Sequence, residues 1–238
     1  MKAFGHEWTN AMDGGRVIDR QRPWMRFDSE AVWTDSNGNI NLGIRTSPKD
    51  VRHWDGKTYK TKYAVGVMRS VDTFSHGRFT AEIQLPKGRN LWPSFWLVGD
   101  GRWPDNGEID IMEAWSDGKG SYFRPTIPQF PYLVPGWKTT NNTHFLVDGM
   151  HGYTGTRNVP WCKQPKNPSE NFIRYEVEWR PNNVIFRVNG NVTRQYGWNV
   201  AQHLIGKRMH VIFNLWTDSE DFTLDTPMVI KSFSYKPS

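Results

Sequence analysis

Polar and apolar residues alternate in short runs along most of this chain, as in β-strands that bury one face. Residues 39–45 alternate after the turn cluster 35–38, and residues 78–85 alternate up to Pro86. The pair Asn189-Gly190 predicts a two-residue type I′ hairpin turn between two such runs. The other runs predicted as strands are 175–179, 184–188, 191–193, 210–216 and 228–230.

Helix signals are weak, and only residues 200–204 predict a turn or two of helix. Residues 117–171 are rich in Pro, Gly and Asn, so we expect mostly long loops there. The 238 residues contain no internal repeat, no linker and no apolar run long enough to span a bilayer. The sequence therefore predicts a single domain over residues 1–238, built as an antiparallel β-sandwich.

One predicted strand carries three acids, Glu108, Asp110 and Glu113. Side chains alternate between the two faces of a strand, so Glu108 and Asp110 share one face and the isoleucines beside them point to the other. In a regular strand Glu113 would point to the opposite face, and it joins the other two acids only if one residue loops out. A β-bulge at residues 111–112 would bring all three acids onto one face, and bulges are common beside active sites.

Three neighbouring carboxylates repel one another, so at least one should keep its proton near neutral pH. A retaining glycosidase needs this arrangement. One carboxylate attacks the anomeric carbon, and a protonated carboxyl about 5–5.5 Å away donates to the leaving oxygen. The spacing alone is weak evidence, because 24 of the 238 residues are acidic and an edge strand with a solvated acidic face would look the same.

The composition adds an aromatic surplus and a positive charge. The 13 Trp residues exceed what a core needs, and flat indole rings suit the apolar faces of sugars as well as nucleobases. The net charge of +6 favours an anionic partner, although a solvated surface with modest excess charge explains it equally well. Cys162 is the single cysteine, so we predict no disulfide, no metal site and no cofactor.

Together with its surroundings, the acidic triplet resembles glycoside hydrolase family 16, which includes laminarinases, agarases, porphyranases and carrageenases. Glu-x-Asp-x-x-Glu, with an apolar residue at each x, resembles the family signature. The resemblance extends over roughly residues 30–236. The other segments that resemble family motifs are 74–79, 85–88, 91–97, 175–190 and 212–215.

The resemblance implies a β-jelly-roll of two curved antiparallel sheets, with an open substrate cleft on the concave face. By analogy, Glu108 is the nucleophile, Asp110 its helper and Glu113 the acid/base. A family histidine usually lies near the acids, and His151 is favoured over His144 for this place. The tryptophans expected to bind sugar are Trp92, Trp103 and Trp115, with Trp96 placed either in the cleft or in the core.

The chain departs from the family pattern outside the triplet. Thr80 and Glu82 stand where many members carry Glu and Arg, and no opening strand is predicted before Arg26. Lys231 begins a segment without the acidic residue often found there, which argues against the family's structural calcium site. These departures indicate an outlying subfamily with an unusual substrate.

Two substrate classes remain open. The net charge favours a sulfated or related algal galactan, whereas the tryptophan-rich motifs are more typical of enzymes that cut β-1,3-glucan. Sulfate binding would need basic side chains in the cleft. The candidates are Arg69 and Arg102, followed by Arg124, Arg157 and Lys138.

Two non-enzymatic functions also fit parts of the pattern. A lectin-like jelly-roll would bind sugar without cutting it, but it has no need of three crowded acids. A nucleic-acid binder fits the basic, aromatic composition, but the Lys and Arg residues are scattered and an acidic strand would repel phosphate. We therefore expect an endo-acting glycosidase that binds an anionic polysaccharide as a monomer, with no nucleic acid or membrane as partner.

The first residues of the chain bear on its location. Residues 1–7 lack the apolar region of a signal peptide, so the protein is either cytosolic or has had its export signal removed. The family resemblance favours a secreted, periplasmic or cell-surface protein.

Overall fold

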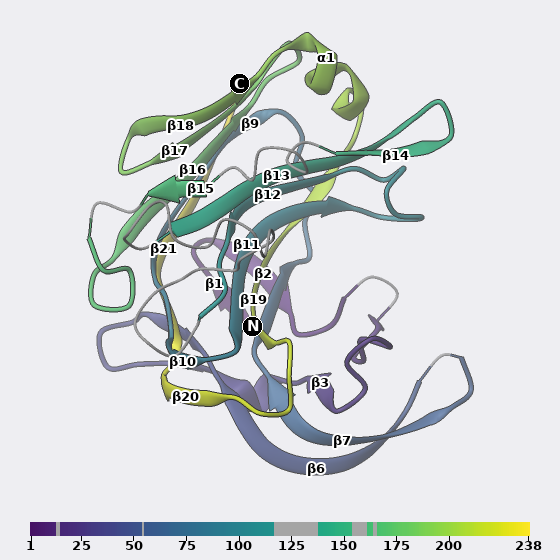
Figure 1. Ribbon diagram of the computed structural model, residues 1–238, viewed down its shortest axis with the longest axis vertical. Helices are drawn as coiled ribbons and strands as arrows, with labels where there is room; N and C mark the ends of the chain where they lie inside the picture. Colours follow the sequence, from purple (N-terminus) through teal and green to yellow (C-terminus); the bar gives the residue numbers. More distant parts are fainter. Residues whose placement is uncertain (13–14, 54, 117–137, 154–160, 164–165) are drawn as a thin grey trace, which may run out of the picture.

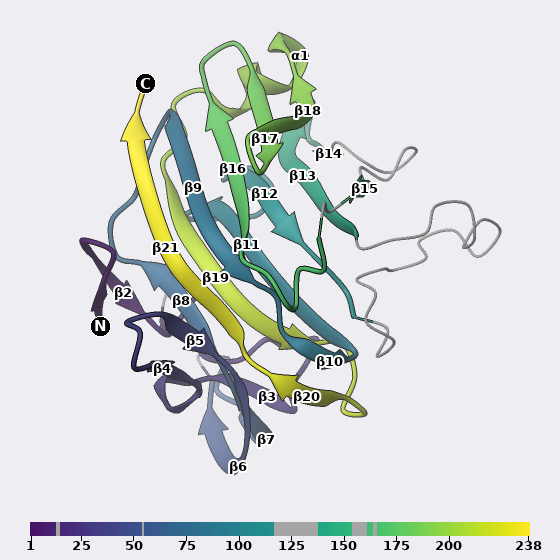
Figure 2. The ribbon, with the colours of Figure 1, turned by 90° about the vertical axis from the view of Figure 1, so that its left-hand side faces the viewer.

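Two large antiparallel sheets stack face to face in the computed structural model (Figures 1 and 2). The structure describes residues 1–12, 15–53, 55–116, 138–153, 161–163 and 166–238. This arrangement confirms the predicted all-β jelly-roll sandwich. Among the described residues, none of the helices has the length and apolar character needed to cross a bilayer.

The nine-stranded sheet carries the acidic strand near its middle. Six of its strands follow one another through antiparallel pairings from β2 to β13, with short strands at both edges. The order across the whole sheet is β1 (Lys2–Ala3), β2 (His6–Thr9), β8 (Val67–Ser70), β19 (Met209–Thr217), β11 (Leu91–Gly99), β12 (Glu108–Glu113), β13 (Lys138–Val147) and β14 (Met150–Tyr153), with β15 (Trp161–Lys163) also paired to β13.

The seven-stranded sheet forms the second layer and confirms most of the strands predicted from alternation. Asn189 and Gly190 have φ of 49° and 83°, which are the positive values that a type I′ turn requires. The order across this sheet is β18 (Asn191–Tyr196), β17 (Val184–Val188), β16 (Ile173–Trp179), β9 (Gly77–Gln84), β21 (Met228–Pro237), β5 (Ile40–Leu42) and β4 (Val32–Thr34).

The core lies between the two sheets, where the alternating apolar residues of both layers meet. Phe95 and Phe213 stack on each other with ring centroids 4.6 Å apart, and Phe233 from the opposite sheet packs edge-on against Phe213. Ile109 and Ile111 of β12 are fully buried in the same cluster. Because the apolar face of β12 is fixed in the core, its acidic face must point out of the sandwich.

Smaller elements complete the molecule. The described residues 200–204 form helical turns as predicted, at the top of Figure 1. A three-stranded sheet at the bottom of Figure 1 combines β3 with β7 in parallel and β7 with β6 antiparallel. These elements are β3 (Met25–Phe27), β6 (Ile44–Arg52), β7 (Thr58–Val65), β10 (Lys87–Arg89), β20 (Thr223–Thr226), η2 (Ser29–Ala31), α1 (Trp198–Ala201) and η3 (Gln202–Leu204).

Two predictions about the chain's organisation are wrong. The chain does form strands before Arg26, because β1 and β2 pair with each other and β2 pairs with β8. The region 117–171 also contains strands, namely β13, β14 and β15. β13 reads as a loop because residues 138–144 are all polar. Asn142 and His144 lie opposite the acids Asp110 and Glu108, whereas Thr143 lies opposite Ile109 on the other face.

Candidate active site

The predicted β-bulge on β12 is present. Against β11, Asp110 pairs with Trp96 and Met112 pairs with Phe95, so Ile111 has no partner of its own. Against β13, the register also shifts between Asp110 and Glu113. The extra residue shifts the alternation of side chains by one position, so Glu113 lies on the face shared by Glu108 and Asp110, as the sequence predicted.

A pocket of about 630 Å³ opens on this face of the nine-stranded sheet. Directly paired residues of antiparallel strands share a face, so Trp96 of β11 and Ile212 of β19 lie on the same side as Asp110. The pocket has aromatic, aliphatic and charged walls. Its lining residues are Met12, Arg16, Asp19, Gln21, Arg22, Phe27, Arg69, Trp92, Trp96, Val98, Gly99, Gly101, Trp103, Asn106, Glu108, Ile212 and Trp216.

Each outer acid of the triplet accepts a hydrogen bond from a tryptophan. The indole Nε1 of Trp103 donates to Glu108 Oε2 at 3.1 Å, and that of Trp92 donates to Glu113 Oε1 at 3.0 Å. Trp115 stacks on Trp92 with ring centroids 5.4 Å apart. Two of the tryptophans predicted to bind sugar, Trp92 and Trp103, therefore contact the acids directly, and Trp115 lies behind Trp92.

Trp96 lies in the cleft wall and not in the core. Its indole Nε1 donates to Asn214 Oδ1 at 2.7 Å, and its ring packs against Trp216. This hydrogen bond holds the ring in the lining of the pocket, beside Asp110 of β12.

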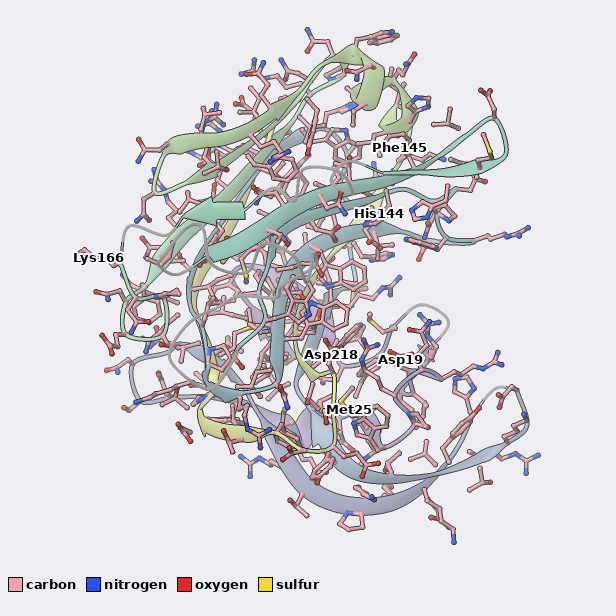
Figure 3. All side chains as sticks on the ribbon, viewed as in Figure 1. Asp19, Met25, His144, Phe145, Lys166 and Asp218 are labelled. Carbon is pink, nitrogen blue, oxygen red and sulfur yellow. The ribbon has the colours of Figure 1, made fainter. Side chains whose placement is uncertain are left out.

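The histidine beside the acids is His144, so the preference for His151 is wrong. His144 lies opposite Glu108 in the β12–β13 register, and its Nε2 is 3.6 Å from Glu108 Oε1 and 3.4 Å from Asp110 Oδ2. His151 lies behind it, with Nε2 at 2.8 Å from His144 Nδ1 and its ring against Trp103. Burial and the neighbouring His144 lower the pKa of His151. Figure 3 labels His144 on its strand.

Burial and mutual repulsion change the protonation of the acids. Burial raises the pKa of Asp110 to about 8, and a hydrogen bond with Glu108 opposes this shift. Burial and the negative charge of Asp110 raise the pKa of Glu108 well above its usual range, whereas His144 and the Trp103 hydrogen bond act to lower it. The pair therefore keeps a proton near neutral pH, as the crowding of the triplet predicted.

Two of the five basic side chains proposed for sulfate binding, Arg69 and Arg102, are among the described residues. Arg69 lines the pocket but its Nη2 bonds Asp100 Oδ1 at 2.7 Å. Arg102 is exposed and is not among the residues that line the pocket. Arg124, Arg157 and the side chain of Lys138 lie outside the described residues.

Sequence reasoning missed one wall of the pocket. The segment of residues 10–27 contributes Met12, Arg16, Asp19, Gln21 and Arg22. Arg22 binds Asp218, which is 196 residues away in the chain, so no local pattern reveals this contact. In the sequence, only the concentration of charged residues before Arg26 indicates that this segment could contribute to a site.

Three side chains of the site also have the spacing of metal ligands. Glu108, Asp110 and His144 each offer an atom within 4.8 Å of the others. Carboxylate and imidazole together suit several divalent metals. Glu108, one of the three, also lines the pocket.

Part of the chain is similar in sequence to known glucanases. A β-glucanase from Rhodothermus marinus is 30% identical over 162 residues, covering 65% of this chain and 49% of that protein. A glucan endo-1,3-β-glucosidase from Cryptopygus antarcticus is 30% identical over 135 residues, covering 47% and 48%. The chain thus spans about half the length of the curated relatives it matches.

The fold also matches a solved structure. The κ-carrageenase from Pseudoalteromonas carrageenovora, in complex with an oligotetrasaccharide of κ-carrageenan, superposes with a TM-score of 0.66 at 15% identity, covering 99% of this chain and 89% of that chain. At this identity the likeness extends to the fold alone. The model of glycosyl hydrolases family 16 matches residues 26–230, which include the complete acidic triplet. The chain therefore belongs to glycosyl hydrolase family 16.

Proposed function

We propose that this protein is a retaining, endo-acting glycosidase that cuts a β-1,3-linked glucan. The observation that carries the proposal is the bulged strand β12, which presents Glu108, Asp110 and Glu113 on one face beside an aromatic pocket. A sugar-binding protein has no need to bury a repelling pair of carboxyls, which costs stability. A polysaccharide is too large to enter a cell, so the protein acts outside the cytoplasm.

In the first step, the Glu108 carboxylate attacks the anomeric carbon. The bond from that carbon to the leaving oxygen breaks, and Glu113 gives its proton to this oxygen. A covalent glycosyl–Glu108 ester remains. In the second step, Glu113 takes a proton from water, the water oxygen bonds to the anomeric carbon, and the Glu108 carboxylate leaves.

Asp110 and His144 prepare Glu108 for the attack. Burial raises the pKa of Asp110 to about 8 and that of Glu108 well above its usual range, so at neutral pH the two carboxyls share a proton. The attack requires the form in which this proton lies on Asp110 and Glu108 is ionised. The indole N–H of Trp103 and the nearby His144 favour that form of Glu108.

The assignment to a neutral glucan rests on the walls of the pocket and on the relatives. Indole rings of Trp92, Trp96 and Trp216 line it, and flat apolar rings suit sugar faces. Arg22 and Arg69 are ion-paired with aspartates, so they contribute little free charge. The curated relatives from Rhodothermus marinus and Cryptopygus antarcticus are named as glucanases.

A sulfated galactan is the second candidate. Three arginines line the pocket, and among these Arg16 is exposed at its rim. Guanidinium groups match sulfate geometry with two parallel hydrogen bonds. The carrageenase of the same fold adds a precedent for this substrate class within the family architecture.

The first experiment measures reducing ends released from laminarin, lichenan, agarose, porphyran, and κ- and ι-carrageenan. Oligosaccharides from laminarin support the glucan assignment, and oligosaccharides from a sulfated galactan alone replace it with the second candidate. Binding without any cleavage across the panel would reject the enzymatic function.

The paired variants Glu108→Gln and Glu113→Gln test the roles of the two acids. Each should lose about 10²–10⁴-fold or more in kcat while still binding the polysaccharide. Asp225→Asn, an exposed change on β20, serves as the control and should keep full activity. Near-normal turnover in either glutamine variant contradicts the assignment.

A further inference from the structure

Arg22 sits at the centre of a contact network in the pocket wall. Its guanidinium binds Asp19 Oδ2 and Asp218 Oδ1, each at 2.8 Å, and only 15% of the side chain is exposed. The two aspartates come from segments far apart in the sequence and lie close together in Figure 3. An arginine held by two carboxylates through both amino groups has a fixed plane.

This fixed plane lies against Trp92. The guanidinium carbon is 4.7 Å from the centroid of the Trp92 ring and 5.9 Å from that of Trp216. Trp92 is further held by the stacked Trp115 and by the edge of Trp216 at 5.5 Å. The indole therefore has contacts with aromatic or cationic groups on several sides, and Arg22 supplies the charged one.

Trp92 connects Arg22 to the acid/base. Its Nε1 donates to Glu113 Oε1 at 3.0 Å. A cation beside an indole ring draws on its electrons and makes the ring N–H a better hydrogen-bond donor. Arg22 therefore contacts the same indole ring whose N–H binds Glu113.

We propose that Arg22 is a positioning residue for proton transfer, acting on Glu113 through Trp92. The inference rests on the proposed role of Glu113. Arg22 lies before residues 26–230, the part of the chain that matches the family model, so this control belongs to the N-terminal segment of this protein. Arg22 and its partner Asp19 are then part of the active site.

Arg22→Met tests the proposal with two kinds of substrate. On the polysaccharide that the wild type cuts, we expect a loss of kcat of roughly 10- to 100-fold with KM changed by less than about threefold, because the general acid is misplaced. The second substrate is the 2,4-dinitrophenyl glycoside of the disaccharide that the wild type releases, laminaribiose for a β-1,3-glucan. Dinitrophenolate leaves without a proton, so the acid is not needed.

Sodium azide removes the need for the base as well. Azide forms a C–N bond to the anomeric carbon of the glycosyl–Glu108 ester as the Glu108 carboxylate leaves, with no proton transferred. With the dinitrophenyl substrate and azide, Arg22→Met should return to within about threefold of the wild type. Arg22→Lys keeps the charge but not the planar fork, so its kcat on the polysaccharide should fall between those of the wild type and Arg22→Met.

Two further variants separate the possible results. Arg20→Met removes a nearby, 60% exposed arginine whose contact with Asp55 is 3.9 Å, and it should behave as wild type. Glu113→Gln should be rescued by azide, and if it is not, the role of Glu113 fails and this inference fails with it. If Glu113→Gln is rescued and Arg22→Met stays slow on the dinitrophenyl substrate, or mainly raises KM, Arg22 acts on substrate binding or on folding and the proposal is wrong.

Discussion

At the scale of single residues, neutral donors hold the two outer acids of the triplet. Trp103 and Trp92 each offer one N–H to an outer carboxyl, at 3.1 and 3.0 Å. A hydrogen bond from a neutral group orients a carboxyl without adding a competing charge to a site that must bind sugar. Asp110 has no such donor from an indole, and its Oδ2 lacks a hydrogen-bond partner among the described residues.

The burial of Asp110 predicts an unusual dependence of stability on pH. Its pKa is raised to about 8 in the folded protein from 3.8, so between these values the folded state binds a proton that the unfolded chain releases. Folding stability is then greatest at the acidic end of this window and falls as the pH rises towards 8. An amide side chain at this position cannot ionise, so the Asp110→Asn variant escapes this loss.

Melting curves of Asp110→Asn and the wild type check this directly. The Tm of Asp110→Asn relative to that of the wild type should rise steadily from pH 5 to pH 8, by at least about 2–4 °C over this interval, the shift expected for roughly 1 kcal/mol in a domain of this size. The exposed Asp225→Asn should show no such pH-dependent gain. An equal Tm difference at both pH values would mean that Asp110 is ionised in the folded protein.

At the scale of elements, the bulge at Ile111 decides which face the acid/base occupies. Apart from this residue, the pairing of β12 with β11 is regular, with Asp110 opposite Trp96, Met112 opposite Phe95 and Glu113 opposite Ser94. Deleting Ile111 would therefore make the pairing of β12 with β11 continuous and would leave each of these residue pairs unchanged. The three acids would then alternate as Glu-x-Asp-x-Glu and stay on one face.

Deleting Ile111 alone should therefore harm activity less than deleting Ile111 and Met112 together, which would move Glu113 to the other face of the strand. We expect the Ile111 deletion to lower the Tm, because a fully buried side chain and the bond from Asn141 Nδ2 to the Ile111 carbonyl are lost. Its kcat should remain within roughly 10²-fold of the wild type and at least about tenfold above that of Glu113→Gln. Reducing-end assays and circular dichroism measure both properties.

Deleting Ile111 together with Met112 is the matched control. It places Glu113 directly after Asp110, on the core face of the strand, so activity should fall to the level of Glu113→Gln or below. If the single deletion folds but is as inactive as the double one, the bulge has a geometric role in catalysis beyond parity.

Alternation predicted the elements that bury one face, and it also predicted the bulge, because the parity of Glu113 is visible in the sequence. It failed for β13, whose side chains on both faces are polar. The choice between His144 and His151 depends on the register between β12 and β13, and residue order alone does not fix that register. Arg22 was missed because its partners Trp92 and Asp218 are distant in the chain.

At the scale of the whole molecule, the positive charge is concentrated away from the pocket. Residues 44–65, which form the β6–β7 hairpin, carry six cationic and two acidic residues, a net +4 of the total +6. All six cations are exposed, and none of them lines the pocket. They are Arg45, Lys49, Arg52, Lys57, Lys60 and Lys62. The overall charge, which first favoured an anionic substrate, is thus a property of this hairpin.

This separation predicts how the rate responds to salt. On a neutral glucan, kcat/KM should change by less than about twofold between about 50 and about 300 mM NaCl, because the arginines Arg22 and Arg69 of the pocket are already paired. The double variant Lys57→Gln/Lys60→Gln should elute earlier from a cation exchanger, yet keep the same rate. Salt and the hairpin charges affect the encounter with anionic molecules only. A neutral polysaccharide carries no such charge, so neither added salt nor the double variant should change the rate at which it is cut. A rate that falls tenfold or more over this range, and falls further in the double variant, would instead identify an anionic polysaccharide that is drawn in by the hairpin before it reaches the acids.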